Sequence, residues 1–377
     1  MNCQERIFLM ATHLKVSESV CAGHPDKLAD QISDAILDEA IRQDKHAHTA
    51  VETLVANNLI VLAGEVSTAA KLDYADITKK VIFENGYIDE NWGFTDKSEI
   101  KIAIHEQSPE IAIGVGDDDS GAGDQGLMYG YACNETEQKM PLAITLAHEI
   151  TKKIDDSRTN GQIPFLRPDG KSQVVLKYEN DKAVGIEHIT IAVPHSENVK
   201  LAEVKFEMIK NIITPVAEKF NFKVPKNIIV NGTGVWHNPG PSSDVGLTGR
   251  KIIVDTYGGA AKAGGGAFSG KDPSKVDRSG AYAARYIAKN IVASGLADRA
   301  EVCLAYYIGG KKSLVKDIET FGTAKATPKV IQAYAESLID CSVAGIINAL
   351  DLKTPIYSQT STYGHFGKPN LPWEKIQ

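Results

Sequence analysis

Segments with a helical repeat of apolar residues alternate along this chain with segments of strand character, which excludes all-helical and all-strand folds. In the stretch Pro25–Gln43, apolar residues recur at every fourth position from Leu28 to Ala40, and this spacing gives a helix one apolar stripe. A proline at the first helical position fits such a start. His24 and Asp26 are therefore expected at the helix N-terminus, where the partial positive charge lies. The alternation as a whole predicts a mixed α and β class.

Two apolar runs, 49–56 and 59–67, are separated by Asn57-Asn58 and predict a hairpin with a two-residue loop. Side chains alternate between the faces of a strand, so this register places Glu52 and Glu65 on the same face, diagonal to one another. On an exposed face the two glutamates are solvated charges. On a covered face, two neighbouring carboxylates need cations.

The remaining elements follow from the same patterns. Further strands are expected at 99–106, 172–178, 186–193, 227–231, 251–255 and 300–308. Further helices are expected at 140–154, 198–220, 277–294 and 328–348, with Asp277 or Ser279 as cap of the third. Residues 107–126 hold five glycines and four aspartates, a composition and length typical of a functional lid or a disordered segment.

A glycine-rich stretch at 264–275 contains three consecutive glycines followed by two lysines. Such a run is costly to order, so it indicates a place where backbone approaches something bulky. Exposed amide groups beside ammonium charges suit a polyphosphate. Gly265, Gly270 and Lys271 also match part of the phosphate-loop pattern, but Asp272 stands where that pattern has Ser or Thr. The stretch is a candidate phosphate-binding loop, with a flexible turn as the alternative.

The net charge of −7 disfavours general nucleic-acid binding, so a polyanionic substrate requires a local cluster of Lys and Arg. The five cysteines form no CxxC pair, which argues against a disulfide framework or a zinc site and fits a reducing cytosol. No apolar run approaches the length of a membrane span. The apolar stretch within residues 1–10 is too short for a signal peptide. We therefore expect a cytoplasmic protein without nucleic-acid or membrane partners.

Five segments together resemble the S-adenosylmethionine synthetase family, also called methionine adenosyltransferases. They occur in the family's order and cover about residues 12–375. The segments are SESV with GHPDK at 17–27, GAGDQG at 121–126, RPDGKS at 167–172, GLTGRK through YGG at 246–259, and the glycine-rich stretch 264–278.

The resemblance implies that methionine sulfur attacks the ribose C5′ of ATP, that the whole triphosphate leaves, and that it is then cleaved to pyrophosphate and phosphate. It also implies two Mg²⁺ per site and K⁺. The implied fold is α+β, with three similar domains at 12–110, 121–237 and 238–375, each with a mixed sheet and helices, that do not follow one another as simple beads. The implied assembly is a homodimer with shared active sites, often paired into a homotetramer.

Site residues are carried over by matching motifs. The resemblance implies a catalytic role for His24, Arg250 and Lys271. It implies ATP contacts for His24, Asp169, Lys171, Trp236, Asp244, Arg250, Lys251, Ala267 and Lys271. It implies methionine contacts for Glu65, Gln107, Asp124, Asp244 and Lys275. Implied metal ligands are Asp26 and Asp277 for Mg²⁺, which takes few carboxylates, and Glu52 for K⁺.

The chain departs from the family pattern at residues 231–241. Trp236 stands where the family has a Phe that stacks on adenine, and an indole should stack at least as well. Val235 replaces an Arg, which removes a donor for any phosphate or interface contact at this position. We expect these changes to affect kinetics and nucleotide preference rather than the reaction.

Two other functions stay open from the sequence. A phosphate-loop kinase or ATPase would cleave ATP at the γ-phosphate to give ADP, whereas a synthetase gives an adenosyl product. A nucleotide-binding regulatory subunit without activity would need a lost catalytic position, yet His24, Asp26, Arg250 and Lys271 are all present.

Overall fold

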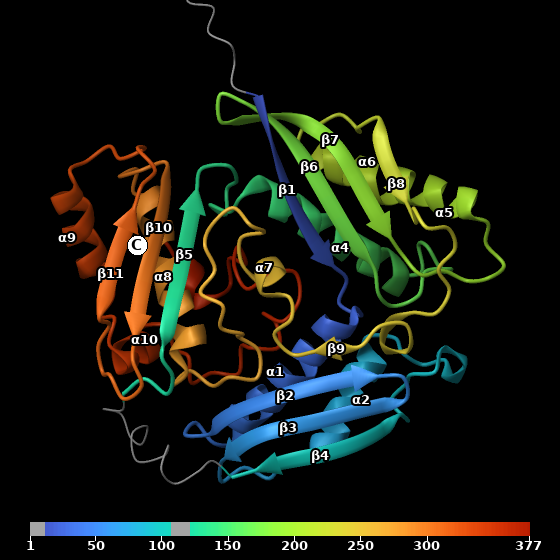
Figure 1. The fold of residues 1–377 in the computed structure, drawn as a ribbon, viewed down its shortest axis with the longest axis horizontal. Helices are drawn as coiled ribbons and strands as arrows, with labels where there is room; N and C mark the ends of the chain where they lie inside the picture. Colours follow the sequence, from blue (N-terminus) through green and yellow to red (C-terminus); the bar gives the residue numbers. More distant parts are fainter. Residues whose placement is uncertain (1–11, 107–120) are drawn as a thin grey trace, which may run out of the picture.

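The computed structural model describes residues 12–106 and 121–377. Within these residues the strands form two four-stranded sheets and one three-stranded sheet. Each sheet carries helices, and the three layers surround a central region of loops and helix ends (Figure 1). The predicted mixed α and β class is confirmed.

The first sheet has the strand order β4-β3-β2-β9. Strands β2 (His48–Ala56) and β3 (Leu59–Ser67) form the predicted antiparallel hairpin. Strand β4 (Glu99–His105) runs parallel to β3, and the short β9 (Gly246–Leu247) runs antiparallel to β2. This sheet thus takes its fourth strand from a segment almost 200 residues further along the chain than β2.

Helices α1 (Pro25–Gln43) and α2 (Tyr74–Glu84) share one apolar core with the first sheet. The bounds of α1 are those predicted from its proline and its four-residue apolar spacing. Glu52 lies opposite Ala63 in the hairpin, also as predicted. Glu52 and Glu65 therefore share the face that does not pack on α1, and in this single chain Glu52 is exposed.

The second sheet has the order β1-β6-β7-β8. Its strands are β1 (Thr12–Val20), β6 (Lys171–Glu179), β7 (Lys182–Ala192) and β8 (Asn227–Val230). Its core includes side chains of α4 (Leu142–Thr159) and of one continuous helical run. That run consists of α5 (Leu201–Glu207), the π-helical turn η2 (Met208–Ile213) and α6 (Thr214–Lys219).

The third sheet has the order β11-β10-β5 and is antiparallel throughout. Its strands are β5 (Gly126–Cys133), β10 (Arg299–Tyr306) and β11 (Val315–Glu319). Helix α8 (Val276–Ala293) packs on β5 and β10 and is buried on nearly all sides. Glycine at position 130 permits this close approach, because a Cβ there would lie 1.9 Å from the Ala284 carbonyl carbon.

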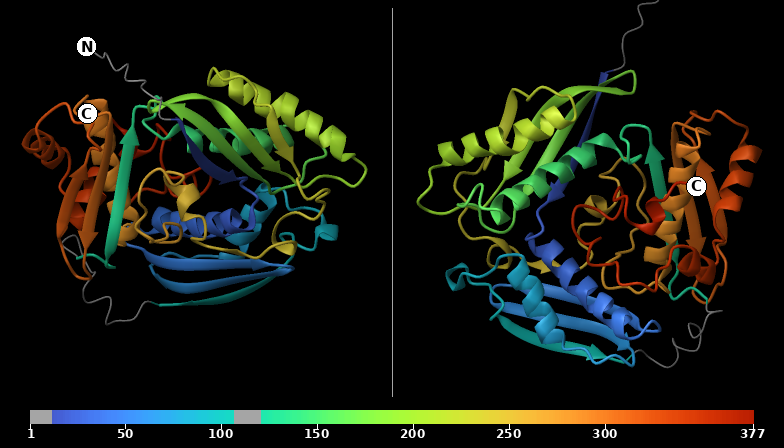
Figure 2. Two further views of the ribbon diagram at one scale, coloured as in Figure 1. Left: turned by 45° about the horizontal axis from the view of Figure 1, so that its top comes forward. Right: turned by 180° about the vertical axis from the view of Figure 1, so that it is seen from behind.

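The sheets exchange strands between distant parts of the chain. Strand β1, which precedes α1, pairs with β6, and β5 pairs with β10. These crossovers confirm that the three layers are not separate beads. They bring the N-terminal ends of α1 and α8 and the short helix α7 (Ile252–Asp255) toward the centre, as two further views show (Figure 2).

The C-terminal segment is anchored on α8 by a buried charge cluster. Glu374, in the short 3₁₀ turn η4 (Pro372–Glu374), accepts hydrogen bonds from Arg285 at 3.0 and 2.8 Å and from Lys289 at 2.8 Å. Burial raises the pKa of this carboxyl, but the two cations outweigh that effect and hold it below the usual value. Among the described helices, none combines the length and the apolar content that a bilayer crossing requires.

The prediction of a strand at 251–255 was wrong, because this segment is the helix α7. A short apolar run cannot be assigned to strand or helix by periodicity alone. Here the amide of Asp255 donates to the carbonyl of Lys251 at 2.8 Å and closes a helical turn. The Asp255 carboxylate also accepts a 2.6 Å hydrogen bond from Lys27 of α1, which holds the turn in place.

Two predictions about other helices were also wrong. Neither Asp277 nor Ser279 caps α8, whose N-cap residue is Lys275, and the Lys275 side chain makes no capping hydrogen bond to the helix. The predicted helix 328–348 is two helices, α9 (Pro328–Leu338) and α10 (Val343–Ala349). The break occurs because the Asp340 carboxylate accepts from the amide and hydroxyl of Ser342, and Ser342 then caps α10.

Candidate active site

His24 lies at the N-cap of α1 and is almost fully buried. Its Nδ1 accepts a hydrogen bond from the amide of Asp26 at 3.2 Å, so the ring proton of the neutral form is on Nε2. Burial, followed by the nearby charges of Lys251 and Lys171, lowers the pKa of His24 to about 3. The imidazole is therefore a neutral hydrogen-bond donor at physiological pH.

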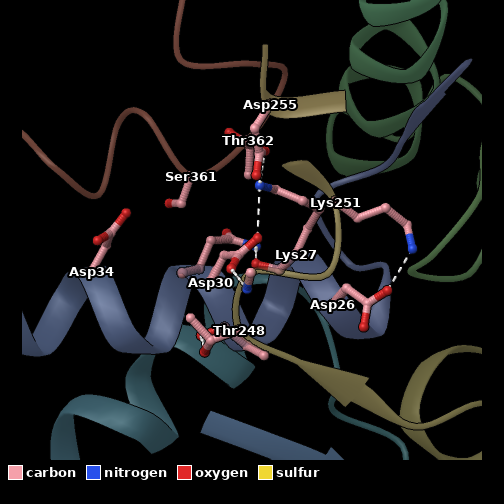
Figure 3. A network of polar contacts seen from close by, with 12 residues as sticks. Asp26, Lys27, Asp30, Asp34, Thr248, Lys251, Asp255, Ser361 and Thr362 are labelled. Atoms are coloured by element: carbon pink, nitrogen blue, oxygen red, sulfur yellow. Dashed lines mark hydrogen bonds and ion pairs between the residues drawn. The ribbon is translucent and has the colours of Figure 1, made fainter. Parts of the chain in front are cut away.

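Asp26, in the first turn of α1, meets the segment 246–251, which we call loop A. Its Oδ1 accepts from the amide of Leu247 at 3.0 Å, and its Oδ2 accepts from Lys251 Nζ at 2.5 Å. Arg250 Nε lies 3.5 Å from the same carboxylate. Burial raises the pKa of Asp26, but the hydrogen bonds from Lys251 and from the Leu247 amide outweigh burial and leave the pKa below its usual value. Figure 3 shows the contact between Asp26 and Lys251 at the end of α1.

Arg250 and Lys251 are the cations of loop A. The segment 264–271, which we call loop B, carries a further cation, Lys271. Lys271 Nζ donates to Asp277 Oδ2 at 2.5 Å and lies 4.0 Å from Asp124 Oδ2. Asp277 stands in the first turn of α8, and burial raises the pKa of its carboxyl despite the lysine. A Cβ at Gly266 would lie 2.3–2.7 Å from the Asp277 carboxyl group, so the triple glycine allows loop B to pass this carboxylate.

Loops A and B are in contact with one another. A Cβ at Gly249 of loop A would lie 2.4 Å from the Cβ of Ala267 in loop B, and Gly249 has a φ of 79°. Only glycine accommodates both the left-handed conformation and the close approach. The structure therefore gathers Arg250, Lys251 and Lys271, which the sequence places about 20 residues apart, at two touching loops.

Lys275 and Asp272 form a buried pair beside loop B. Asp272 also accepts from the amide of Thr49 at 2.8 Å. Burial raises the pKa of Asp272, but Lys275 and His48 outweigh it and hold it far below the usual range. Asp272 thus joins loop B to β2, and the ammonium of Lys275 already has a carboxylate partner in this structure.

This geometry does not support the kinase or ATPase alternative. A phosphate loop of that kind follows a strand and leads directly into a helix. Here the element before loop B is α7, and α8 begins at Val276, five residues after Lys271.

Asp169 lies in the loop before β6 and next to Gly23, where a Cβ would lie 2.8 Å from the amide nitrogen of Asp169. Its backbone is left-handed, with φ of 90°, and its carboxylate accepts from the amides of Gly170 at 2.6 Å and Gly240 at 3.1 Å. Burial raises the pKa of Asp169 to about 7. Lys171, two residues later, is exposed at the start of β6.

Trp236 lies in the segment that leads to Gly240, whose amide donates to Asp169. Its Nε1 donates to the carbonyl of Asn238 at 2.6 Å, and its own carbonyl accepts from the amide of His195. Val235, which replaces the family's arginine, is 61% exposed. Asp244 is exposed in the following turn, and its amide donates to the carbonyl of Gly240.

Two predicted ligands lie on the outer face of the first sheet. Glu65 is 3.5 Å from the imidazole of His105 on β4, and Glu52 is exposed on β2. Gln107 and most of the predicted lid, residues 107–120, lie outside the described residues. In residues 12–106 and 121–377, no three His, Cys, Asp or Glu side chains gather as a preformed metal cage.

The donor set still fits Mg²⁺ in one respect. Asp26 and Asp277 each offer one carboxylate next to a phosphate-binding candidate, and Mg²⁺ commonly takes one or two carboxylates together with phosphate oxygens and water. Each of these carboxylates is paired with a lysine in this structure. A polyphosphate that binds the lysines would release the carboxylates for a metal ion.

The sequence analysis missed the buried groups that support these loops. Lys27 donates to Asp30 at 2.9 Å and to Asp255 at 2.6 Å, and Arg278 forms a two-bond pair with Asp34 at 2.7 and 3.0 Å. One sequence pattern could have indicated these groups: aspartates recur at every fourth position of α1, from Asp26 to Asp38, and so lie on one side of the helix.

Comparison with known proteins gives concordant matches. Family models of S-adenosylmethionine synthetase match the chain with the N-terminal domain at residues 12–109, the central domain at 119–236 and the C-terminal domain at 239–375. The chain is also 50% identical, over 370 residues, to the S-adenosylmethionine synthase of Sulfurovum sp. (strain NBC37-1). That alignment covers 97% of this chain and 96% of the relative.

Proposed function

Because the chain belongs to the S-adenosylmethionine synthetase family, a metal-dependent family that acts on ATP and methionine, we propose that loops A and B bind the triphosphate that leaves. The protein is a methionine adenosyltransferase and makes S-adenosylmethionine from these two substrates. The thioether is a neutral, weak nucleophile, so alignment and stabilisation of the leaving group carry most of the rate.

In this proposal Arg250, Lys251 and Lys271 neutralise the phosphate oxygens, while the buried His24 donates its Nε2 proton in a hydrogen bond to the leaving oxygen. A neutral imidazole is suited to this task because it polarises the bond without adding a charge that must be desolvated. The pairing of Lys251 with Asp26 and of Lys271 with Asp277 is the observation that carries the proposal. Each lysine then exchanges its carboxylate for a phosphate oxygen.

Asp26 and Asp277 are freed by that exchange to hold Mg²⁺, two ions per site, and Glu52 is the proposed K⁺ ligand. The bound cations would supply charge neutralisation at the triphosphate, both for its departure and for its later cleavage to pyrophosphate and phosphate. Arginine adds a forked donor, which matches phosphate oxygens in a way that lysine does not.

Adenine would stack on Trp236, with Asp169 and Lys171 contacting the nucleotide and Ala267 approaching it through its backbone. Both carboxylate oxygens of Asp169 already accept hydrogen bonds from backbone amides, those of Gly170 and Gly240. Through Gly240, Asp169 also supports the segment that carries Trp236, so it contributes to the nucleotide site in two ways. Methionine would contact Glu65, Gln107, Asp124, Asp244 and Lys275, and the lid at 107–126 would exclude water from the site.

We further propose a homodimer with shared sites, paired into a homotetramer. On the outer face of the first sheet, Leu54, Val61 and Ala63 surround Glu52 and are only partly exposed. A second copy covering this face would supply the covered environment in which the two glutamates need cations.

The proposed domain ranges are 12–110, 121–237 and 238–375. The proposed location is the cytoplasm, because the thiols of Cys21, Cys133 and Cys341 are free and buried, which suits a reducing compartment.

Product analysis tests the proposed chemistry. The enzyme is incubated with ATP, methionine, Mg²⁺ and K⁺, and products are followed by mass spectrometry and ³¹P NMR. We expect S-adenosylmethionine, pyrophosphate and phosphate in equal amounts. Release of ADP, or of intact tripolyphosphate as the final product, would contradict the proposal.

A further inference from the structure

Helix α1 carries four buried aspartates, at positions 26, 30, 34 and 38, on one face. A spacing of four residues places them one above another, about 6 Å apart along the helix axis. Figure 3 shows the first three along the helix, with the segment of Thr248 and Lys251 passing over it. We call these four residues the aspartate ladder.

The two middle members bind the two phosphate loops at equivalent points. Asp30 Oδ1 accepts from the amide of Gly249 at 2.8 Å, and Asp34 Oδ1 accepts from the amide of Gly270 at 2.9 Å. Gly249 directly precedes Arg250, and Gly270 directly precedes Lys271. Each aspartate thus anchors the glycine that directly precedes a proposed phosphate-binding cation.

Both glycines are left-handed, with φ of 79° at Gly249 and 81° at Gly270. A Cβ at Gly270 would lie 2.0 Å from the carbonyl oxygen of Val51. The two turns are therefore sterically tight as well as anchored, so the direction in which each cation leaves its loop is fixed by local geometry.

Buried cations hold the two aspartates in turn. Lys27 bridges Asp30 and Asp255, while Arg278 pairs with Asp34 and donates to the carbonyl of Lys271 at 3.2 Å. Asp34 therefore accepts from the amide of Gly270, and its partner Arg278 donates to the carbonyl of Lys271, so the backbone is held on both sides of the Lys271 side chain. A buried carboxylate with a complete set of partners is rigid, because any displacement leaves a charge unpaired.

The outermost member has the same chemistry but a different target. Asp38 accepts from the amides of Tyr357 at 2.9 Å and Ser358 at 2.8 Å, in the C-terminal segment. Asp38 thus stabilises the fold without contacting either phosphate loop, and it offers a control on the same face of the same helix.

We propose that Asp30 and Asp34 are positioning residues for the reaction, because they tie loops A and B to successive turns of one rigid helix and thereby set the separation of Arg250 and Lys251 from Lys271. The proposal rests on the proposed function of these loops. It assigns α1 a second role beyond presenting His24 and Asp26, namely a common support for both halves of the phosphate site.

The test compares Asp30→Ala, which removes the acceptor of the Gly249 amide, with Asp30→Asn, which keeps a carbonyl oxygen there, and with the control Asp38→Ala. Each full-length variant is assayed for S-adenosylmethionine formation and, separately, for hydrolysis of inorganic tripolyphosphate with Mg²⁺. Melting temperatures are recorded in parallel, and assays run well below the lowest of them.

We expect Asp30→Ala to lower kcat of both reactions by about 10- to 100-fold, since a misplacement of about 1 Å can cost about 10²-fold. KM for methionine should change little, and Asp30→Asn should restore most of the activity. Asp38→Ala should lose stability but retain kcat. Equal losses of kcat in Asp30→Ala and Asp38→Ala, or no rescue by Asp30→Asn, would overturn the proposal.

Two further measurements keep the result decisive. If Asp30→Ala does not fold, Thr248→Val replaces it, because the Thr248 hydroxyl accepts from the amide of Thr53 at 2.9 Å and lies 2.8 Å from the hydroxyl of Ser33 on α1. Lys251→Ala is assayed alongside. If Lys251→Ala leaves tripolyphosphate hydrolysis intact, the proposed function of loop A fails. If Lys251→Ala abolishes hydrolysis while Asp30→Ala keeps the parental kcat, only the positioning role fails.

Discussion

Replacing Lys271 with alanine tests the leaving-group role most directly. The Lys271 side chain is 23% exposed, and its ammonium lies 2.5 Å from Asp277 and 4.0 Å from Asp124. Two unit charges 4 Å apart interact by about 4 kcal/mol at an effective dielectric constant of about 20. Removing one preorganised donor from a developing charge costs about 2.7–4 kcal/mol, or about 10²–10³ in kcat. We therefore expect Lys271→Ala to lower kcat for S-adenosylmethionine formation about 10²–10³-fold.

The assay follows S-adenosylmethionine by chromatography at saturating ATP, methionine, Mg²⁺ and K⁺. Lys262→Ala is the matched control, because Lys262 lies two residues before the same glycine-rich stretch and is also paired with a carboxylate, Glu301, at 2.9 Å. Its ammonium is paired with Glu301 on β10 and not with Asp277, and its loss should leave kcat close to that of the parent. Lys271→Arg, which keeps the charge, should recover part of the lost rate.

The reasoning is refuted if Lys271→Ala melts like the parent and turns over at the parental rate. It is also refuted if Lys262→Ala and Lys271→Ala lose kcat to the same extent. The loss of rate would then come from removing a positive charge from this region and not from the position of the Lys271 ammonium.

Three other variants give independent checks. Glu52→Gln should weaken activation by K⁺ far more than binding of ATP, because an amide does not neutralise a cation; titration of K⁺ at fixed ATP measures this, and an unchanged K⁺ dependence argues against the assignment. Trp236→Ala should raise KM for ATP about 5- to 150-fold without raising that for methionine, since stacking of a base on an aromatic ring is worth about 1–3 kcal/mol; Trp236→Phe should behave like the parent in the same assay. Glu374→Gln should lower the free energy of unfolding in urea by about 3–5 kcal/mol, because Arg285 and Lys289 are then buried without their carboxylate. Since the folded-state pKa of Glu374 is lowered, its stabilisation is present above the unfolded-state pKa of about 4.3 and is lost as pH falls through the folded-state pKa; unfolding of the variant should depend less on pH in that acid range.

Local signals in the sequence were sufficient for the elements that carry much of the site. The bounds of α1 followed from Pro25 and a regular apolar stripe, and its N-terminus placed His24 and Asp26 correctly. The register of the β2–β3 hairpin followed from its two-residue loop, which fixed the relation of Glu52 to Glu65. These features depend on residues close in sequence, so the physics that determines them can be read locally.

Contacts between distant segments could not be predicted in this way. Strands β1 and β5 were not identified, because their partners are more than 150 residues away and their pairing depends on the assembled sheets. The aspartates at positions 30 and 34 resembled the solvated face of a helix, since nothing nearby in sequence supplies their partners. The segment 251–255 became a helix for the same reason, as its Asp255 is held by Lys27 from another layer. The roles of the site residues that the motifs supplied stay predictions, and Gln107 lies outside the described residues.

The exchange of strands has a consequence during synthesis of the protein. Val20, at the end of β1, pairs with Lys171 at the start of β6, so the ribosome must add about 150 residues before the first strand meets its neighbour. At about 5–20 residues per second, that interval lasts roughly 8–30 s. Throughout it, the nascent chain presents an unpaired strand edge that is open to wrong partners. A gene cut between the domain ranges would make this delay permanent, so we expect the isolated fragments to aggregate where the whole chain folds.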